Sequence, residues 1–309
     1  MVAVVDTGVG TRIPALSGRV TTIGEAGKDC VGHGSFVAGL VAAAPQTDAG
    51  FTGIAPEARI LAVRGTDERG VATATTVAHG IRAAVDGGAG AISVSLALPS
   101  RNKDLSAAVR YAVDHDTVVV AAAAPDTQPR GLSSGQQPPS AYWPAAEPGV
   151  LSVVDFGADG GRPNGVPAPQ ADLAAPGSGV VSVGPSGSGA FAGSGSSLAA
   201  GVVAGVAALV RSYHPKMTAP QVVQQLMATA YSAQVPKVDP YGAVSGTLTG
   251  MRPTVSQRPV AVKMPEAAKD GGAVARGTWV ALGSALVALI VILGAYIVPR
   301  GRERGWRAE

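Results

Sequence analysis

The chain has few of the residues that cross-link or ligate. Cys30 is its one cysteine, and it has only four histidines in 309 residues. An internal disulfide is therefore excluded, and a Cys/His metal site is not expected. The carboxylates do not recur with the spacing of a calcium loop either, so we expect no metal and no other cofactor.

Aromatic residues and net charge are also scarce. Aromatics make up 4% of a chain that is 46% hydrophobic and contains 42 glycines, so we expect a core built by close approach of backbones. The formal charge is +3, and much of it lies in residues 299–309. Residues 1–298 together are nearly neutral, which argues against a nucleic-acid-binding face.

A Gly/Ser turn that opens a small-residue helix is the most distinctive stretch. It runs from Gly193 through Ser196 and Ser197, and no charge follows until Arg211. Such a helix can be packed on all sides, and a serine in its first turn lies beside free N–H donors in a positive field. That position suits stabilisation of an oxyanion, although a serine there is also a common helix cap.

Two earlier stretches favour catalysis. Residues 2–5 predict a buried strand that ends in Asp6, and His33 stands between two glycines at the start of a small-residue helix over 33–43. Aspartate, then histidine, then serine is the chain order of one known type of catalytic triad.

With these three boxes, residues 1–245 resemble the subtilisin-like serine proteases, and specifically the mycosins, the membrane-anchored proteases of type VII secretion. The resemblance implies an α/β, subtilisin-like three-layer fold with a mainly parallel sheet between helices. It also implies Ser197 as nucleophile, His33 as base and Asp6 as the carboxylate that orients the base. Ser196 stands where the family has threonine, and Gly201 where it has proline.

Alternating strands and helices support this fold class. A turn that leads into a short strand is expected over residues 53–64, and further strands over 91–97, 117–124, 150–154 and 172–177. Helices are expected over 75–85 and 105–115 and after Thr218. In the family, the strand over 91–97 lines the substrate cleft and pairs with the peptide backbone. The resemblance therefore makes substrate-binding candidates of Ser93, Val94, Ser95 and Leu96, and the same run also fits a central core strand.

The chain departs from the family at the oxyanion hole. The family strand ends in Ala-Ala-Gly-Asn, and the asparagine amide donates to the oxyanion. Here we expect Pro125 in the asparagine position, where it offers no N–H, with Asp126 beside it as an acceptor that repels an oxyanion. Losing this donor costs about 10²–10³ in kcat, so slow turnover is expected. A substitute amide from Gln128 is an open alternative.

The C-terminal part predicts a membrane anchor. Residues 246–277 have the composition of a flexible linker, and residues 278–298 form an apolar run of about the 20 residues that span a bilayer. Trp279 and Tyr296 lie near its two ends, and four arginines follow in a basic tail over 299–309. We therefore expect a single-pass protein of the cell membrane, with a cytoplasmic C-terminus and residues 1–245 as an extracytoplasmic peptidase domain.

Two features at the N-terminal side differ from the family. The first strand follows Met1 directly, where the family usually has a leader and an extension, so either the start is misassigned or the chain is a truncated copy. Mycosins often carry a cysteine just before the histidine box, as Cys30 is here, but its usual disulfide partner is absent.

Three functions fit these observations. The first is a membrane-anchored endopeptidase that cleaves peptide or protein substrates through an acyl-enzyme at Ser197. The second is an inactive scaffold that keeps the fold as a packing surface in a type VII secretion membrane complex. The third is a module that binds peptides along residues 91–97 without cleaving them.

Overall fold

The computed structural model describes residues 1–127, 139–162 and 166–246, together with residues 279, 282–284, 286–287, 289, 292–293, 295 and 297–300. The chain divides into two units, Met1–Thr249 and Gly250–Glu309. Gln128, most of the expected linker and most of the basic tail lie outside the described residues.

A parallel sheet forms the centre of the first unit. Its seven strands have the order β2-β3-β1-β4-β5-β6-β7 and are β1 (Val2–Asp6), β2 (Val20–Thr22), β3 (Ile60–Arg64), β4 (Ala91–Val94), β5 (Val118–Ala122), β6 (Val150–Phe156) and β7 (Leu173–Pro176). All the pairings in this sheet are parallel. The inner strands β1, β4 and β5 are buried along their whole length because both faces of the sheet are covered.

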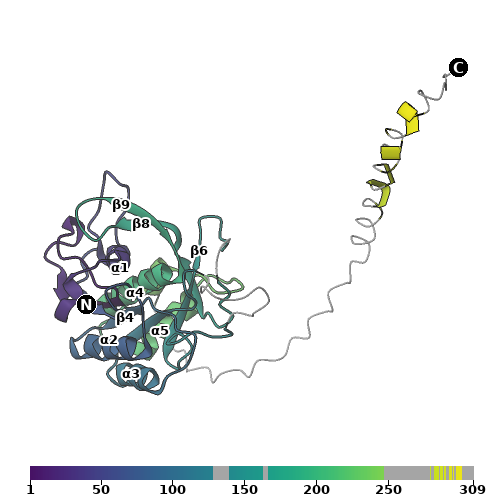
Figure 1. The fold of residues 1–309 in the computed structure, drawn as a ribbon. Helices are drawn as coiled ribbons and strands as arrows, with labels where there is room; N and C mark the ends of the chain where they lie inside the picture. Colours follow the sequence, from purple (N-terminus) through teal and green to yellow (C-terminus); the bar gives the residue numbers. More distant parts are fainter. Residues whose placement is uncertain are drawn as a thin grey trace, which may run out of the picture. The chain divides into compact units, whose positions relative to one another are not determined.

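Helices cover the two faces. They are α1 (His33–Ala42), α2 (Ala74–Asp86), α3 (Lys103–Asp114), α4 (Ser196–Tyr213), α5 (Ala219–Thr229) and α6 (Pro240–Ser245), with short 3₁₀ turns η1 (Pro14–Leu16) and η2 (Gly24–Gly27). Val2 and Val4 pack in one cluster with α1, α4 and α5, whereas Ala3 and Val5 pack in another with α2 and α3. Alternate residues of β1 thus face opposite layers. In Figure 1, α2 and α3 lie below β4, and α1 and α4 lie above it. The expected α/β fold with a parallel sheet between helices is confirmed.

The strand order reverses at β1, and this reversal locates the site. β1 pairs with β3 on one side and with β4 on the other, and later strands continue outward from β4. In open α/β sheets, ligands bind outside the carboxyl ends of the strands at such a reversal. Asp6 is the last residue of β1, so its carboxylate stands at that place.

Two differences from the expected elements affect the site. The strand expected over 91–97 ends at Val94. An antiparallel hairpin of β8 (Ser178–Val183) and β9 (Ala190–Ser194), which the sequence did not predict, leads directly into α4. Its residues have little apolar periodicity, and several are exposed glycines and serines.

One helix within the described residues is long and apolar enough to cross a membrane, and it is α4. Most of α4 is buried in the core of the first unit. In the second unit, the described residues between Trp279 and Arg300 are helical. The large apolar side chains described there are exposed, and include Leu282, Leu286, Leu289, Ile292 and Ile297.

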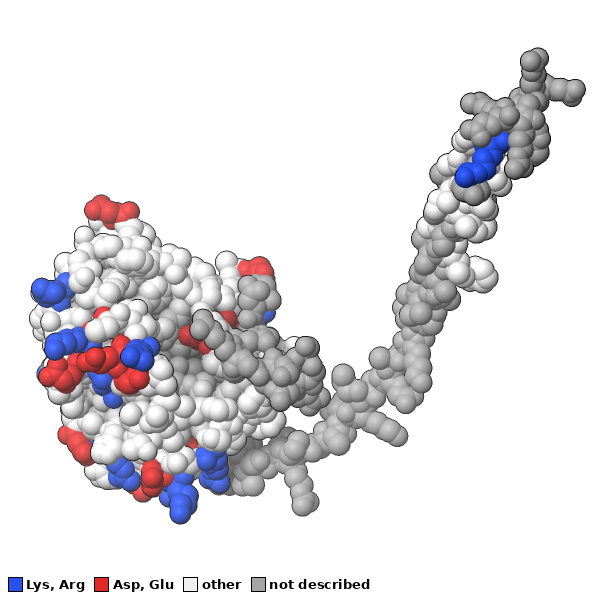
Figure 2. All heavy atoms as spheres, in the orientation of Figure 1, with Lys and Arg blue, Asp and Glu red and all other residues white. Residues whose placement is uncertain are grey.

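The surface of the first unit carries interspersed charges. On the face shown in Figure 2, basic and acidic side chains lie among each other and are separated by uncharged surface. Such a mixed distribution is typical of a solvated surface.

Gly34 permits the approach of α1 to β1. A Cβ built on Gly34 would lie 2.1 Å from the Gly8 carbonyl oxygen and 3.0 Å from Cβ of Asp6. Any side chain at this position would push His33 away from Asp6, because a backbone carbonyl cannot rotate aside as a side chain does.

We expect Gly34→Ala to lower the free energy of unfolding by about 1–3 kcal/mol, the usual cost of overpacking. Gly90→Ala is the matched control, since its Cβ would make ordinary contacts of 3.7 Å with the Arg211 side chain. Chemical denaturation of both variants measures the difference. Equal stabilities would contradict the close approach of α1 to β1.

Candidate active site

Asp6 is held at the end of β1 with no exposed surface. Its Oδ1 accepts a hydrogen bond of 2.6 Å from the backbone N–H of Thr7. The neighbouring Thr7 hydroxyl donates to Asp29 at 2.8 Å and accepts from the N–H of Gly34 at 3.0 Å. The Thr7 hydroxyl therefore joins the end of β1 to the start of α1 next to the Asp6 carboxylate.

His33 is the first residue of α1, and a carboxylate fixes the turn before it. Gly32, the N-cap, has a φ of 88°, a left-handed conformation that favours glycine. Asp29 accepts the N–H of Gly32 at 2.7 Å, and its other oxygen accepts the N–H and the hydroxyl of Ser35 at 2.8 and 2.7 Å. These bonds satisfy N–H groups that would otherwise be free at the helix start.

Ser197 is the second residue of α4, close to the Gly195 turn. Its Oγ lies 2.9 Å from Nε2 of His33. Nδ1 of His33 lies 2.9 and 2.8 Å from Oδ1 and Oδ2 of Asp6. The structure thus brings together, in one hydrogen-bonded chain, the three side chains that the sequence selected as catalytic.

The two carboxylates around His33 shift its pKa. Burial by itself would lower the pKa of His33, but the Asp6 charge and the hydrogen bond to Asp126 raise it well above the ordinary value. Burial would likewise raise the pKa of Asp6, and the charge and hydrogen bond of His33 hold it below its usual range. The pair is therefore charged over a wide range of pH.

Asp126 lies against the same serine. Its Oδ1 accepts the backbone N–H of Ser197 at 3.0 Å, and its Oδ2 accepts the Ser197 hydroxyl at 2.5 Å. Oδ2 also lies 3.2 Å from Nε2 of His33. The expectation that Pro125 takes the family's asparagine position is wrong, because the side chain that reaches Ser197 belongs to Asp126.

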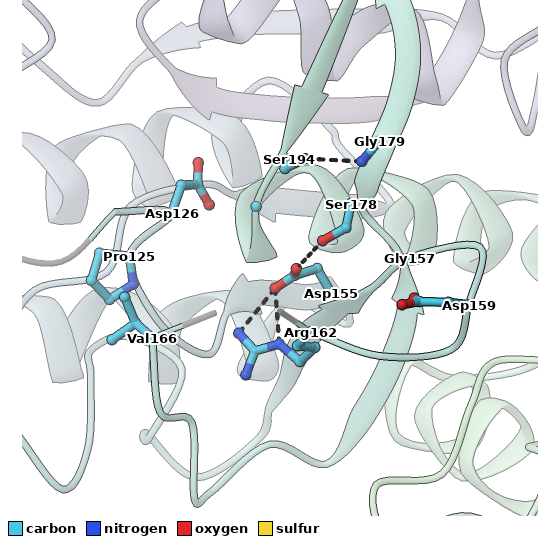
Figure 3. A pocket seen from close by; sticks show the side chains of 11 residues that line it. Pro125, Asp126, Asp155, Gly157, Asp159, Arg162, Val166, Ser178, Gly179 and Ser194 are labelled. Atoms are coloured by element: carbon cyan, nitrogen blue, oxygen red, sulfur yellow. Dashed lines mark hydrogen bonds and ion pairs between the residues drawn. The ribbon is translucent and has the colours of Figure 1, made fainter. Parts of the chain in front are cut away.

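A second carboxylate, Asp155 on β6, organises the turn before α4 (Figure 3). It accepts the hydroxyls of Ser196 and Ser178 at 2.9 and 2.6 Å and two hydrogen bonds from Arg162 at 3.1 and 3.0 Å. Although burial opposes it, the Ser178 hydroxyl and the Arg162 charge hold the pKa of Asp155 below its usual range. Sequence reasoning missed this group. An aspartate within the apolar run of β6 was the available signal.

Two cavities lie beside the Asp126 side chain. One, of about 280 Å³, is lined by Asp155, Arg162 and Gly195 among others. The other, of about 390 Å³, lies beside His33 and has apolar walls that include Phe36, Phe191 and Leu198. Both are large enough for a side chain of a peptide that crosses Ser197.

The four expected substrate-binding residues divide into two pairs. Ser93 and Val94 are fully buried in β4, which is bonded to β1 on one side and β5 on the other, so they present no free backbone edge. The prediction that a substrate peptide pairs with Ser93 and Val94 is therefore wrong. Ser95 and Leu96 follow the strand end, and Leu96 is partly exposed.

The remaining histidines lie elsewhere. His79 is exposed on α2, His115 bonds the Tyr111 carbonyl at the end of α3, and His214 bonds the Val244 carbonyl at the end of α4. Within the described parts of the chain, no three His, Cys, Asp or Glu side chains are grouped as metal ligands.

The chain is similar to known proteins. The model of the Subtilase family matches residues 1–253. Mycosin-3 of Mycobacterium tuberculosis is 38% identical over 296 residues, which cover 75% of this chain and 62% of that protein. The chain therefore spans less than two thirds of the length of this curated relative.

Two solved structures are similar as well. One is described as the MycP3 protease from the type VII (ESX-3) secretion system, with a TM-score of 0.67, 34% identity and coverage of 80% of this chain and 82% of that one. The other belongs to an intact ESX-5 inner membrane complex, with a TM-score of 0.65, 26% identity and coverage of 97% and 85%.

We expect Asp6→Asn to lower the pKa of His33, because the change removes the larger of the two charges that stabilise the imidazolium. In the native chain, the stability that the raised pKa of His33 contributes is fully present below about pH 6.5 and is lost as pH rises through that raised pKa. The stability that the lowered pKa of Asp6 contributes is lost as pH falls through that pKa. NMR titration of the His33 ring measures the shift, and His79, exposed on α2, serves as the internal control. An unchanged His33 midpoint would contradict the contact with Asp6.

Proposed function

The chain belongs to the subtilase family and is a subtilisin-like serine protease; from this premise we propose that it is a mycosin-type endopeptidase of a type VII secretion system, anchored in the membrane by its C-terminal apolar segment. The observation that carries the proposal is the hydrogen-bonded chain from Asp6 through His33 to Ser197. The similarity to Mycosin-3 and to the MycP3 protease supports the assignment to this type.

The proposed mechanism follows from the geometry. Ser197 Oγ attacks the carbonyl carbon of the scissile peptide bond while Nε2 of His33 takes its proton. Asp6, on the Nδ1 side, orients the ring and stabilises the imidazolium that forms. His33 then gives the proton to the leaving amine, and water hydrolyses the acyl-enzyme by the same steps in reverse order.

Stabilisation of the oxyanion is the weak part of this site. The Ser197 N–H is one suitable donor. The family's asparagine amide is replaced by Asp126, whose carboxylate accepts that same N–H. We therefore propose slow turnover compared with subtilases that keep the amide.

The Asp126 carboxylate at the oxyanion site also favours a second function. A chain with an impaired oxyanion site can still serve as a structural subunit, and a chain of similar fold is part of the ESX-5 inner membrane complex. The alternative is an inactive scaffold in a type VII secretion membrane complex. For peptide binding without cleavage along residues 91–97, residues 91–94 offer no free edge, because β4 has a partner strand on both sides.

The domain organisation is part of the proposal. Residues 1–245 form the peptidase domain, 246–277 a linker, 278–298 a membrane-spanning helix and 299–309 a basic cytoplasmic tail. The exposed apolar side chains of the described helical residues near Leu286 support a lipid environment. The arginines after residue 298 favour a cytoplasmic C-terminus and an extracytoplasmic catalytic domain.

We expect a fluorophosphonate to label the native chain slowly at Ser197, and Ser197→Ala to abolish this labelling and the residual peptide hydrolysis, because the nucleophile is lost. Mass spectrometry of the labelled peptide identifies the modified serine. Ser212→Ala, exposed near the other end of α4, is the matched control and keeps both activities.

Absence of labelling and hydrolysis, with co-purification of secretion-complex membrane subunits that survives Ser197→Ala, would instead favour the scaffold. Loss of that co-purification in Ser197→Ala would argue against the scaffold.

We expect the full chain to stay in the membrane fraction after extraction at alkaline pH, because burial of about 20 apolar residues anchors a helix firmly. A chain that ends at residue 277 should become soluble while its peptidase domain stays folded. Fractionation followed by immunoblotting measures both. Equal extraction of the two chains would rule out the anchor.

A further inference from the structure

We propose that the Asp126 carboxylate is a built-in occupant of the oxyanion site that keeps Ser197 and His33 in a non-reactive arrangement, so that the chain is a latent protease which replacement of this one side chain activates. The inference rests on the proposed function and deepens it. It attributes the slow turnover to the Asp126 carboxylate that is present, as well as to the asparagine amide that is missing.

Asp126 occupies the contacts that the reacting carbonyl needs. A tetrahedral intermediate places its negative oxygen on the N–H of the nucleophile's own residue. That N–H already donates to Oδ1 of Asp126 at 3.0 Å. The other oxygen, Oδ2, lies 2.5 Å from Ser197 Oγ and 3.2 Å from His33 Nε2, so the carboxylate bridges every reactive atom of the site.

The single hydroxyl proton of Ser197 is directed away from the base. It donates to Oδ2 of Asp126, because a carboxylate offers only acceptors. Nε2 of His33 then faces both a carboxylate and a hydroxyl oxygen, which suits a protonated nitrogen that donates. An imidazolium has no free lone pair with which to take the serine proton, so the base is disabled as long as this arrangement persists.

Two carboxylates surround the imidazolium. Asp6 faces Nδ1 and Asp126 faces Nε2, at 2.8 and 3.2 Å. Both raise the pKa of His33, as found above. Arg162, which lines a cavity together with Asp126, does not offset the Asp126 charge, because its guanidinium is bound to Asp155 (Figure 3).

The carboxylate also covers the nucleophile. Ser197 has no exposed surface, whereas the Asp126 side chain is 25% exposed. The Asp126 side chain packs against Gly195: a Cβ added to Gly195 would lie 2.1 Å from Cγ of Asp126. A peptide carbonyl can reach Ser197 Oγ only if this carboxylate moves aside.

An amide of the same shape would remove the negative charge and supply a donor. Asparagine carries no charge, so the imidazolium loses one of its two stabilising partners. Its Nδ2–H group donates to an oxyanion, which is the interaction worth about 10²–10³ in kcat. Alanine at the same position would uncover Ser197 without supplying a donor.

The test compares the full native chain with Asp126→Asn, Asp126→Ala and the double variant Asp126→Asn/Ser197→Ala. We expect Asp126→Asn to react with a fluorophosphonate and to hydrolyse a fluorogenic peptide at least about 100-fold faster than the native chain. Asp126→Ala should fall between them, and the double variant should show neither activity. In NMR titrations, the His33 midpoint should move to lower pH in both single variants.

The outcomes separate the two proposals. A native chain that is labelled at Ser197 as fast as the Asp126→Asn variant would overturn the latent state and leave the proposed function standing. No labelling at Ser197 in any variant, with the fold intact by circular dichroism and the His33 midpoint shifted, would overturn the proposed protease function and the latent state with it. An unmoved His33 midpoint would show that Asp126 does not face the imidazole.

Discussion

The contact between the Asp6 carboxylate and the His33 imidazole is the constraint on which the rest of the site depends. It requires the last residue of β1 and the first residue of α1 to meet, although 27 positions separate them. The reversal of strand order places Asp6 at the carboxyl edge of the sheet, Gly34 lets the helix approach β1, and Asp29 fixes the turn between them. Each of these features is a property of small residues and backbone hydrogen bonds, which fits a chain with so few aromatic side chains.

Much of this could be predicted from the sequence, because the strongest patterns are local. Buried strands that alternate with small-residue helices indicate a parallel sheet between two helical layers, and three boxes around Asp6, His33 and Ser197 mark the side chains that converge. The predictions were weaker where two neighbouring residues compete for one position. Pro125 and Asp126 are adjacent in a loop, and only three-dimensional structure decides which of them reaches Ser197.

The remaining differences have similar causes. A short apolar run such as residues 91–97 fits an edge strand and a central strand equally well, and the pairing of β4 with two neighbours is a tertiary property. Many residues of the hairpin of β8 and β9 are exposed, and its apolar residues show little of the alternation by which a strand is predicted. The link from Arg162 through Asp155 to Ser196 joins three separate segments, so no local signal predicts it.

The carboxylate of Asp126 also bears on how small molecules would discriminate this site. Boronic acids and related reagents become anionic tetrahedral adducts when they bond to a serine oxygen. At Ser197 such an adduct would meet a second negative charge, held within hydrogen-bond distance of the same oxygen. A neutral acylating reagent would avoid this repulsion, and a ligand that directs an ammonium group toward Asp126 would turn it into attraction. A difference of one atom between an amide and an acid would thus set inhibitor selectivity between this chain and relatives that keep the asparagine.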